Sequence, residues 1–140
     1  MNARIRPTAE RDVPRLMSIR AAVAENRLSD PSSVAAADYL PYIARGRLWV
    51  WEERGSLLGF AAVDTASSLL WALFVDPAAA GRGIGTALLA HAVEEARATG
   101  LTELRLSTAP GTSAERLYRR TGWQETGRHP SGDLLMRLTL

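Results

Sequence analysis

The chain contains neither cysteine nor lysine in its 140 residues, and all 17 basic residues are arginine. The lack of cysteine excludes disulfides, thiolate-bound metal sites and a cysteine nucleophile. The lack of lysine excludes a nucleotide P-loop, because that loop requires Gly-Lys followed by Ser or Thr. The chemistry of this chain therefore depends on arginine, carboxylate, hydroxyl and main-chain groups.

Long apolar runs and strong net charge are missing as well. No run approaches the 18 apolar residues typical of a membrane-spanning helix, and residues 1–6 lack the apolar core of a signal peptide. We therefore expect a cytoplasmic protein with no membrane partner. The net charge is only +2 and no continuous basic stripe is present, which argues against a nucleic-acid partner.

The length and the hydrophobic pattern predict one domain over residues 1–140, of a mixed α/β class. Helical spacing of apolar residues and turn residues between apolar runs predict the order β-α-α-β-β-β-α-β-α-β-β. The expected strands are 3–7, 48–53, 57–63, 68–75, 104–108, 123–126 and 133–140, and the expected helices begin near Asp12, Ser33, Gly83 and Thr112. Asp12 and Thr112 are candidate N-caps, and Pro41 predicts that the second helix is short or kinked.

Three glycines at alternate positions, Gly81, Gly83 and Gly85, run directly into an amphipathic helix. Glycine permits positive φ and close backbone approach, and a helix start presents unpaired N–H groups with the positive end of its dipole. This combination predicts a site for a phosphate-bearing ligand. A dinucleotide fingerprint does not fit, because the sixth position counted from Gly81 is Thr86 rather than glycine.

Two segments together carry a family resemblance. The first is Val75-Asp76-Pro77 followed by Gly81-Arg82-Gly83-Ile84-Gly85, and the second is Ala-Glu-Arg-Leu-Tyr-Arg-Arg-Thr-Gly-Trp over residues 114–123. In this spacing and order the chain resembles the GNAT superfamily of acyl-CoA-dependent N-acyltransferases. The resemblance implies a mostly antiparallel central sheet flanked by helices, and an amine that attacks acetyl-CoA directly in a ternary complex.

The resemblance also assigns residues to coenzyme A. It implies that Leu73, Phe74 and Val75 pair with the pantetheine arm through their backbone, and that the loop and helix start hold the diphosphate. The complete set of cofactor residues expected in this way is Leu73, Phe74, Val75, Gly81, Arg82, Gly83, Ile84, Gly85, Thr86, Thr108, Thr112, Ala114 and Tyr118. Two positions depart from the family pattern, since Ala80 stands where Gln or Arg is usual and Gly111 where Asn is frequent.

Tyr118 matches the family residue that donates a proton to the departing thiolate. The usual positions of a general base are apolar here, so the candidates are Asp64 first, then Glu52 or Glu53, then a chain of waters. No metal is expected.

For the acceptor, Trp71 is a candidate wall of the pocket, and Asp30 or Glu25 are candidates to receive a cationic amine. The acceptor is expected to be a small molecule or a protein amino group, and a homodimer stays open because dimers are common in the resembled family. The alternative hypothesis is a non-catalytic acyl-CoA-binding or interaction module on the same fold.

Overall fold

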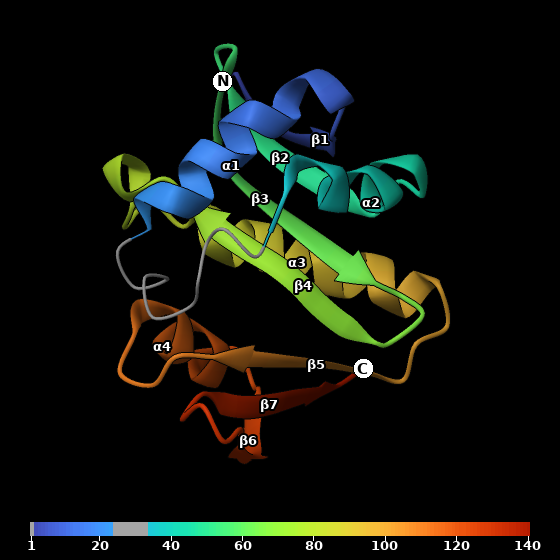
Figure 1. The fold of residues 1–140 in the computed structure, drawn as a ribbon, viewed down its shortest axis with the longest axis vertical. Helices are drawn as coiled ribbons and strands as arrows, with labels where there is room; N and C mark the ends of the chain where they lie inside the picture. Colours follow the sequence, from blue (N-terminus) through green and yellow to red (C-terminus); the bar gives the residue numbers. More distant parts are fainter. Residues whose placement is uncertain (1, 24–33) are drawn as a thin grey trace.

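A computed structural model describes residues 2–23 and 34–140 of the chain. Its strands and helices follow the expected order (Figure 1). They are β1 (Ala3–Pro7), α1 (Val13–Ala22), α2 (Leu40–Ala44), β2 (Leu48–Glu53), β3 (Ser56–Asp64), β4 (Leu69–Val75), α3 (Ile84–Ala98), β5 (Glu103–Thr108), α4 (Ser113–Arg120), β6 (Gln124–Arg128) and β7 (Leu134–Thr139). Among the described residues no helix is both long and apolar enough to cross a membrane.

The second helix is short, as Pro41 predicts, but it does not begin where expected. Its expected start at Ser33 lies outside the described residues, and the chain first forms a 3₁₀ turn over Ala36–Tyr39 before the five-residue α2. Pro41 lies in the first turn of α2, where its missing N–H leaves no hydrogen bond unmade. Pro41 therefore permits a helix start at this position rather than kinking a longer helix.

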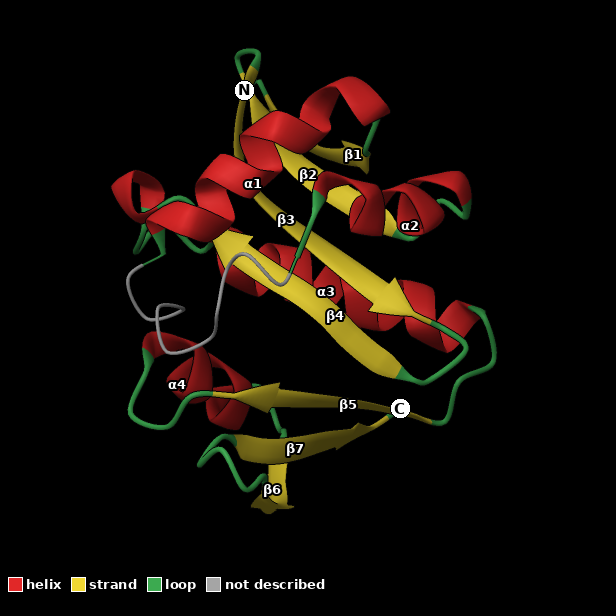
Figure 2. Cartoon of the chain, viewed as in Figure 1, coloured by secondary structure: helices red, strands yellow, loops and turns green. Residues whose placement is uncertain are grey.

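The seven strands form one sheet in the order β1-β2-β3-β4-β5-β7-β6. Every neighbouring pair is antiparallel except β4 and β5, which run parallel. The expected mixed fold with a mostly antiparallel sheet is confirmed. Helices cover both faces, with α1 and α2 in front of the sheet and α3 behind it (Figure 2).

The parallel pair β4–β5 is joined at one point only. Its single registered pair is Leu69 with Arg105, and the Arg105 N–H donates to the Ser68 carbonyl at 2.8 Å. Beyond this point the two strands diverge toward their carboxyl ends (Figure 1). Since Ala62 pairs with Ala72 and Val63 with Leu70, Trp71 is an extra residue that bulges out of β4 near the start of the gap.

Apolar side chains at helical spacing fix α3 to one face of the sheet. Ile84, Leu88, Ala92 and Ala96 are all at most 1% exposed and belong to the larger core cluster. On the other face a second cluster joins α1 to β2, β3 and β4. Trp49 and Trp51 both contact the α3 cluster, as the two-residue period of their strand predicts.

The two expected N-caps have different outcomes. Thr112 caps α4, since its hydroxyl accepts the Glu115 N–H at 3.1 Å. Asp12 directly precedes α1, but its carboxylate does not cap that helix. It accepts instead the Ala9 N–H at 2.8 Å and the Arg6 guanidinium at 3.0 Å, because a charged partner and the preceding turn satisfy its oxygens.

Candidate functional site

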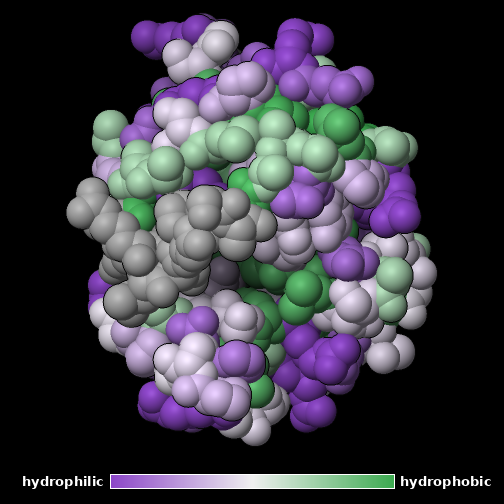
Figure 3. All heavy atoms as spheres, viewed as in Figure 1, coloured by the Kyte–Doolittle hydropathy of each residue, from purple (hydrophilic) through white to green (hydrophobic). Residues whose placement is uncertain are grey.

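A cleft of about 810 Å³ occupies the gap between β4 and β5. Its walls come from residues 70–75 of β4, the loop and helix start from Pro77 to Thr86, residues 106–109 at the end of β5, and α4. In Figure 3 apolar atoms gather in the hollow at the middle of this face. The divergence of two parallel strands therefore creates the cavity, and the elements that follow each strand close its ends.

Main-chain donors line one end of this cleft. Gly81 and Gly83 have φ of +80° and +83°, a conformation that other residues adopt only with strain. In the described part of the chain, the N–H groups of residues 81–86 make no hydrogen bond, and the ladder of α3 begins with the Ala87 N–H on the Gly83 carbonyl at 3.0 Å. Six consecutive unpartnered N–H groups at the start of a 15-residue helix are an arrangement that favours an anion, which makes this end of the cleft a candidate anion site.

The third glycine serves packing. A Cβ at Gly85 would lie 3.4 Å from Val75 Cγ2 and 3.6 Å from a Leu117 methyl. These are ordinary van der Waals distances, so the start of α3 packs directly against both β4 and α4 at Gly85 and lies beside the cleft.

Asp76 fixes the chain between β4 and the glycine loop. Its carboxylate accepts the Ala78 N–H at 3.0 Å and the Arg15 guanidinium at 2.6 Å. The bond from Ala78 and then the contact with Arg15 hold the pKa of Asp76 below its usual range. The loop is therefore anchored to α1 as well as to the sheet.

Tyr118 lies on the α4 side of the cleft and is only 6% exposed. Its ring contacts Trp123 at a centroid distance of 5.5 Å, and its hydroxyl makes no hydrogen bond to a described residue. Burial raises the pKa of the Tyr118 phenol above its ordinary value. The group is consequently a neutral donor at physiological pH.

The structure brings most of the predicted site residues to one cavity. Those that line the cleft are Trp71, Leu73, Phe74, Val75, Gly81, Gly83, Ile84, Gly85, Thr86, Thr108, Thr112, Ala114 and Tyr118. Glu25 and Asp30 lie outside the described residues.

Arg82 and Asp64 do not belong to that lining. The Arg82 guanidinium binds the Glu53 carboxylate of β2 at 2.7 and 2.9 Å, so its position in the loop does not turn it into the cleft. The Asp64 carboxylate accepts the N–H groups of Ala66 and Ser67, at 3.0 and 3.4 Å, and thereby holds the turn between β3 and β4. The expectation that Asp64 serves as a base is therefore not supported by its position.

Sequence reasoning missed Asp133 and Arg120, the carboxylate and the arginine in the described lining. Asp133 follows a Pro-Ser-Gly turn that carries no motif. Leu134 pairs with Thr108 across β5 and β7, so the residue before it lies beside the carboxyl end of β5. Only the register of that pair, which the sequence does not reveal, places Asp133 at the cleft.

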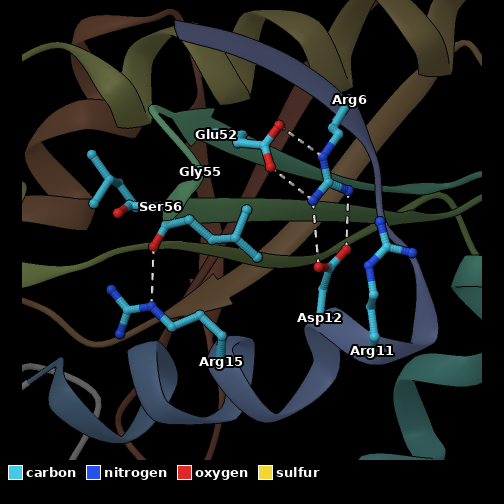
Figure 4. Close-up of a pocket in the computed structure, with 9 residues that line it drawn as sticks. Arg6, Arg11, Asp12, Arg15, Glu52, Gly55 and Ser56 are labelled. Atoms are coloured by element: carbon cyan, nitrogen blue, oxygen red, sulfur yellow. Dashed lines mark hydrogen bonds and ion pairs between the residues drawn. The ribbon is translucent and has the colours of Figure 1, made fainter. Parts of the chain in front are cut away.

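A second cleft of about 610 Å³ lies between β1, β2 and α1. Figure 4 shows the Arg6 guanidinium between Asp12 and Glu52, with Arg15 donating to the Leu57 carbonyl. The hydrogen bond from Arg6 lowers the pKa of Glu52. At Asp12 burial alone raises the pKa, but the hydrogen bonds from Arg6 and the Ala9 N–H and the nearby arginine charges together lower it by more, so that pKa is lowered too. Because its carboxylates and Arg6 already satisfy one another, we interpret this cleft as a structural ion-pair network.

Two other kinds of candidate site, a histidine and a metal cluster, find no support in the structure of the described residues. His129 is exposed and its Nδ1 lies 2.9 Å from the Ser131 hydroxyl, which agrees with a surface role. Among the described residues no cluster of His, Asp and Glu has the arrangement needed to hold a metal ion.

Comparisons with known proteins agree with this architecture. Residues 15–123 match the model of the acetyltransferase (GNAT) family. A 50-residue segment is 48% identical to the peptidyl-lysine N-acetyltransferase YiaC of Escherichia coli, and it spans 36% of this chain and 34% of that protein.

Two solved structures extend the likeness to the whole chain. YncA of Salmonella typhimurium, solved with acetyl-CoA, is 25% identical with a TM-score of 0.78, and covers 100% of this chain and 95% of its own. The PaiA N-acetyltransferase of Thermoplasma acidophilum, solved with coenzyme A, is 18% identical with a TM-score of 0.81 over 100% of both chains. The family model covers most of the chain, including the glycine loop and Tyr118, so this protein belongs to the GNAT family of acetyltransferases.

Proposed function

We propose that residues 1–140 act as one acetyltransferase domain, which transfers an acetyl group from acetyl-CoA to a primary amine by direct attack. One observation carries the proposal: the glycine loop, with its unpartnered main-chain N–H groups, and Tyr118 line the same cleft between diverging strands. The first group suits a diphosphate, and the second suits a leaving group that gains negative charge.

The cleft offers groups suited to successive parts of the cofactor. Residues 81–86 would hold the diphosphate, with the Thr86 hydroxyl as a further donor. Beyond Leu69, the backbone groups of β4 that face β5 have no ladder partner among the described strands. Leu73, Phe74 and Val75 therefore offer an open edge to the amides of the pantetheine arm, and an N–H there would polarise the thioester carbonyl.

The reaction needs a neutral amine and a stabilised leaving group. The amine nitrogen bonds to the carbonyl carbon, the C–S bond breaks, and the sulfur leaves with the electron pair while the nitrogen loses a proton. A thiol has a pKa near 8.5 and a free tyrosine near 10, and burial raises that of Tyr118 further. Full proton transfer from Tyr118 is thus uphill by more than about 2 kcal/mol, so its role is a hydrogen bond to the developing thiolate.

The proton lost by the amine needs an acceptor. Asp133 is the carboxylate in the described lining, whereas Asp64 is occupied by its own turn. We therefore propose that Asp133, rather than Asp64, accepts this proton, directly or through water. Arg120 is the arginine in the same described lining.

The test pairs a calorimetric titration of coenzyme A with an assay of thiol release from acetyl-CoA over a panel of amines. Acetyl transfer to some amines supports the proposal. Saturable binding of acetyl-CoA without transfer to any amine would favour the non-catalytic binding module instead. A lysine-containing peptide belongs in the panel, because the relative YiaC is named for peptidyl-lysine.

A further inference from the structure

Arg120, near the end of α4, is exposed and lines the cleft. Its side chain forms no ion pair or hydrogen bond with a described residue. The next arginine in the chain, Arg119, differs in this respect, because its guanidinium binds two carboxylates at 2.7 and 2.8 Å. Arg120 is therefore a solvent-accessible positive charge at the cleft that the described part of the chain leaves unpaired.

The packing of α4 brings this charge close to the start of α3. A methyl of Leu117 lies 3.6 Å from the position that a Cβ of Gly85 would take. Arg120 follows Leu117 by three residues, and residues at that spacing are neighbours on one side of a helix. Arg120 also lines the same cleft as Gly85 and Thr86. It therefore lies on the side of α4 that meets the candidate anion site.

Coenzyme A carries phosphate at two places on one ribose. The diphosphate is attached to the 5′ carbon, and a separate phosphate, with about two negative charges near pH 7, is attached to the 3′ carbon. When residues 81–86 hold the diphosphate, the 3′-phosphate lies one ribose away from them. The arginine of the loop itself is occupied, because Arg82 binds the Glu53 carboxylate at 2.7 and 2.9 Å. The 3′-phosphate thus needs a cation from outside the loop, and Arg120 is an arginine of the same cleft that is free to bind it.

We infer that Arg120 binds the 3′-phosphate of coenzyme A, and that it thereby selects coenzyme A over donors that share the pantetheine arm and the diphosphate but lack this phosphate. The inference rests on the proposed binding of the diphosphate by residues 81–86. A guanidinium recognises a phosphate through paired N–H groups and stays charged at every physiological pH. Because Arg120 is exposed, salt screens this attraction, so the selection is moderate in size and weakens as the ionic strength rises.

The experiment titrates the protein with coenzyme A and with 3′-dephospho-coenzyme A in a calorimeter. We expect wild-type protein to bind coenzyme A about fivefold to thirtyfold more tightly at low salt, and this preference should shrink between about 0.05 and 0.5 M salt. Arg120→Gln should lose the preference by weakening the binding of coenzyme A alone, because the dephospho ligand offers the guanidinium no 3′-phosphate. Arg120→Lys keeps the charge without the paired N–H groups and should retain part of the preference.

Arg116→Gln is the matched control. Arg116 lies one turn earlier on α4 and is exposed like Arg120, but it does not line the cleft. The preference of Arg116→Gln for coenzyme A should therefore equal that of the wild type. Gly83→Val should weaken the binding of both ligands alike, because both carry the diphosphate. Arg120 and Arg116 are exposed side chains without a described partner, so thermal unfolding should be unchanged in either glutamine variant.

The possible results separate the inference from the proposed function. Equal affinity of wild-type protein for the two ligands, or an unchanged preference in Arg120→Gln, would overturn the inference alone. The same loss of preference in Arg116→Gln would also overturn it, since the effect would then come from the overall charge of α4 rather than from a contact in the cleft. Wild-type protein that binds neither ligand would overturn the proposed function as well.

Discussion

Replacement of Gly83 by valine should abolish tight coenzyme A binding through the backbone rather than through a clash. A Cβ at this position meets no atom within 4 Å, but the φ of +83° costs an ordinary L-residue about 1–2 kcal/mol. A β-branched residue relieves this strain by turning the loop, which misaligns the N–H groups of residues 81–86. Hydrogen bonds to a charged group contribute about 1.5–3 kcal/mol each, so losing two weakens binding by at least a hundredfold.

Gly100 provides the matched control at the other end of α3. Its φ is +89° and a Cβ there also meets nothing within 4 Å, so Gly100→Val carries the same backbone strain far from the anion site. Thermal unfolding should show a similar loss for both variants, roughly 3–8 °C. Calorimetric titration with coenzyme A should separate them, with wild-type affinity only in Gly100→Val. Wild-type affinity in Gly83→Val, or equal weakening in both, would refute the assignment of this loop.

Four further predictions concern the remaining parts of the site and fold. Tyr118→Phe should lower kcat by about tenfold or more with little change in the KM for acetyl-CoA; an unchanged kcat would remove Tyr118 from the mechanism. Because burial raises the pKa of Tyr118, the unfolded chain releases its proton near pH 10 while the folded chain keeps it, so wild-type stability should fall above pH 10 more steeply than that of Tyr118→Phe in alkaline melts. Asp133→Asn should lower kcat/KM near neutral pH while Asp64→Asn does not, as pH–rate profiles of the two would show; the reverse result would return the role of base to Asp64. Asp12→Asn should destabilise the protein by about 2 kcal/mol in urea at pH 7 without changing coenzyme A affinity; since the pKa of Asp12 is lowered in the folded state, this difference should vanish as the pH falls below about 4.

The features that were predictable from sequence are local ones. The glycine spacing predicted the turn that starts α3, the apolar period predicted the buried face of α3, and Thr112 predicted the start of α4. The turn that Asp64 holds could also have been predicted, because an Asp side chain in a turn readily accepts hydrogen bonds from the N–H groups that follow it.

The features that were missed depend on distant partners. Arg82 turns away from the cleft because Glu53, 29 residues earlier in the chain, meets it from β2. Asp133 reaches the cleft through the pairing of β7 with β5. These contacts depend on how the strands pair and how the helices pack, and neither periodicity nor a local motif predicts that.

The single contact between β4 and β5 has a consequence for the mechanics of the molecule. The ladder is continuous from β1 to β4 and again from β5 to β6, but one registered pair joins these two parts. A bound pantetheine arm would lie between β4 and β5 like an additional strand and would connect the two parts of the sheet. We therefore expect cofactor binding to slow amide hydrogen exchange along both facing strands at once, so that the substrate completes the sheet it reacts in.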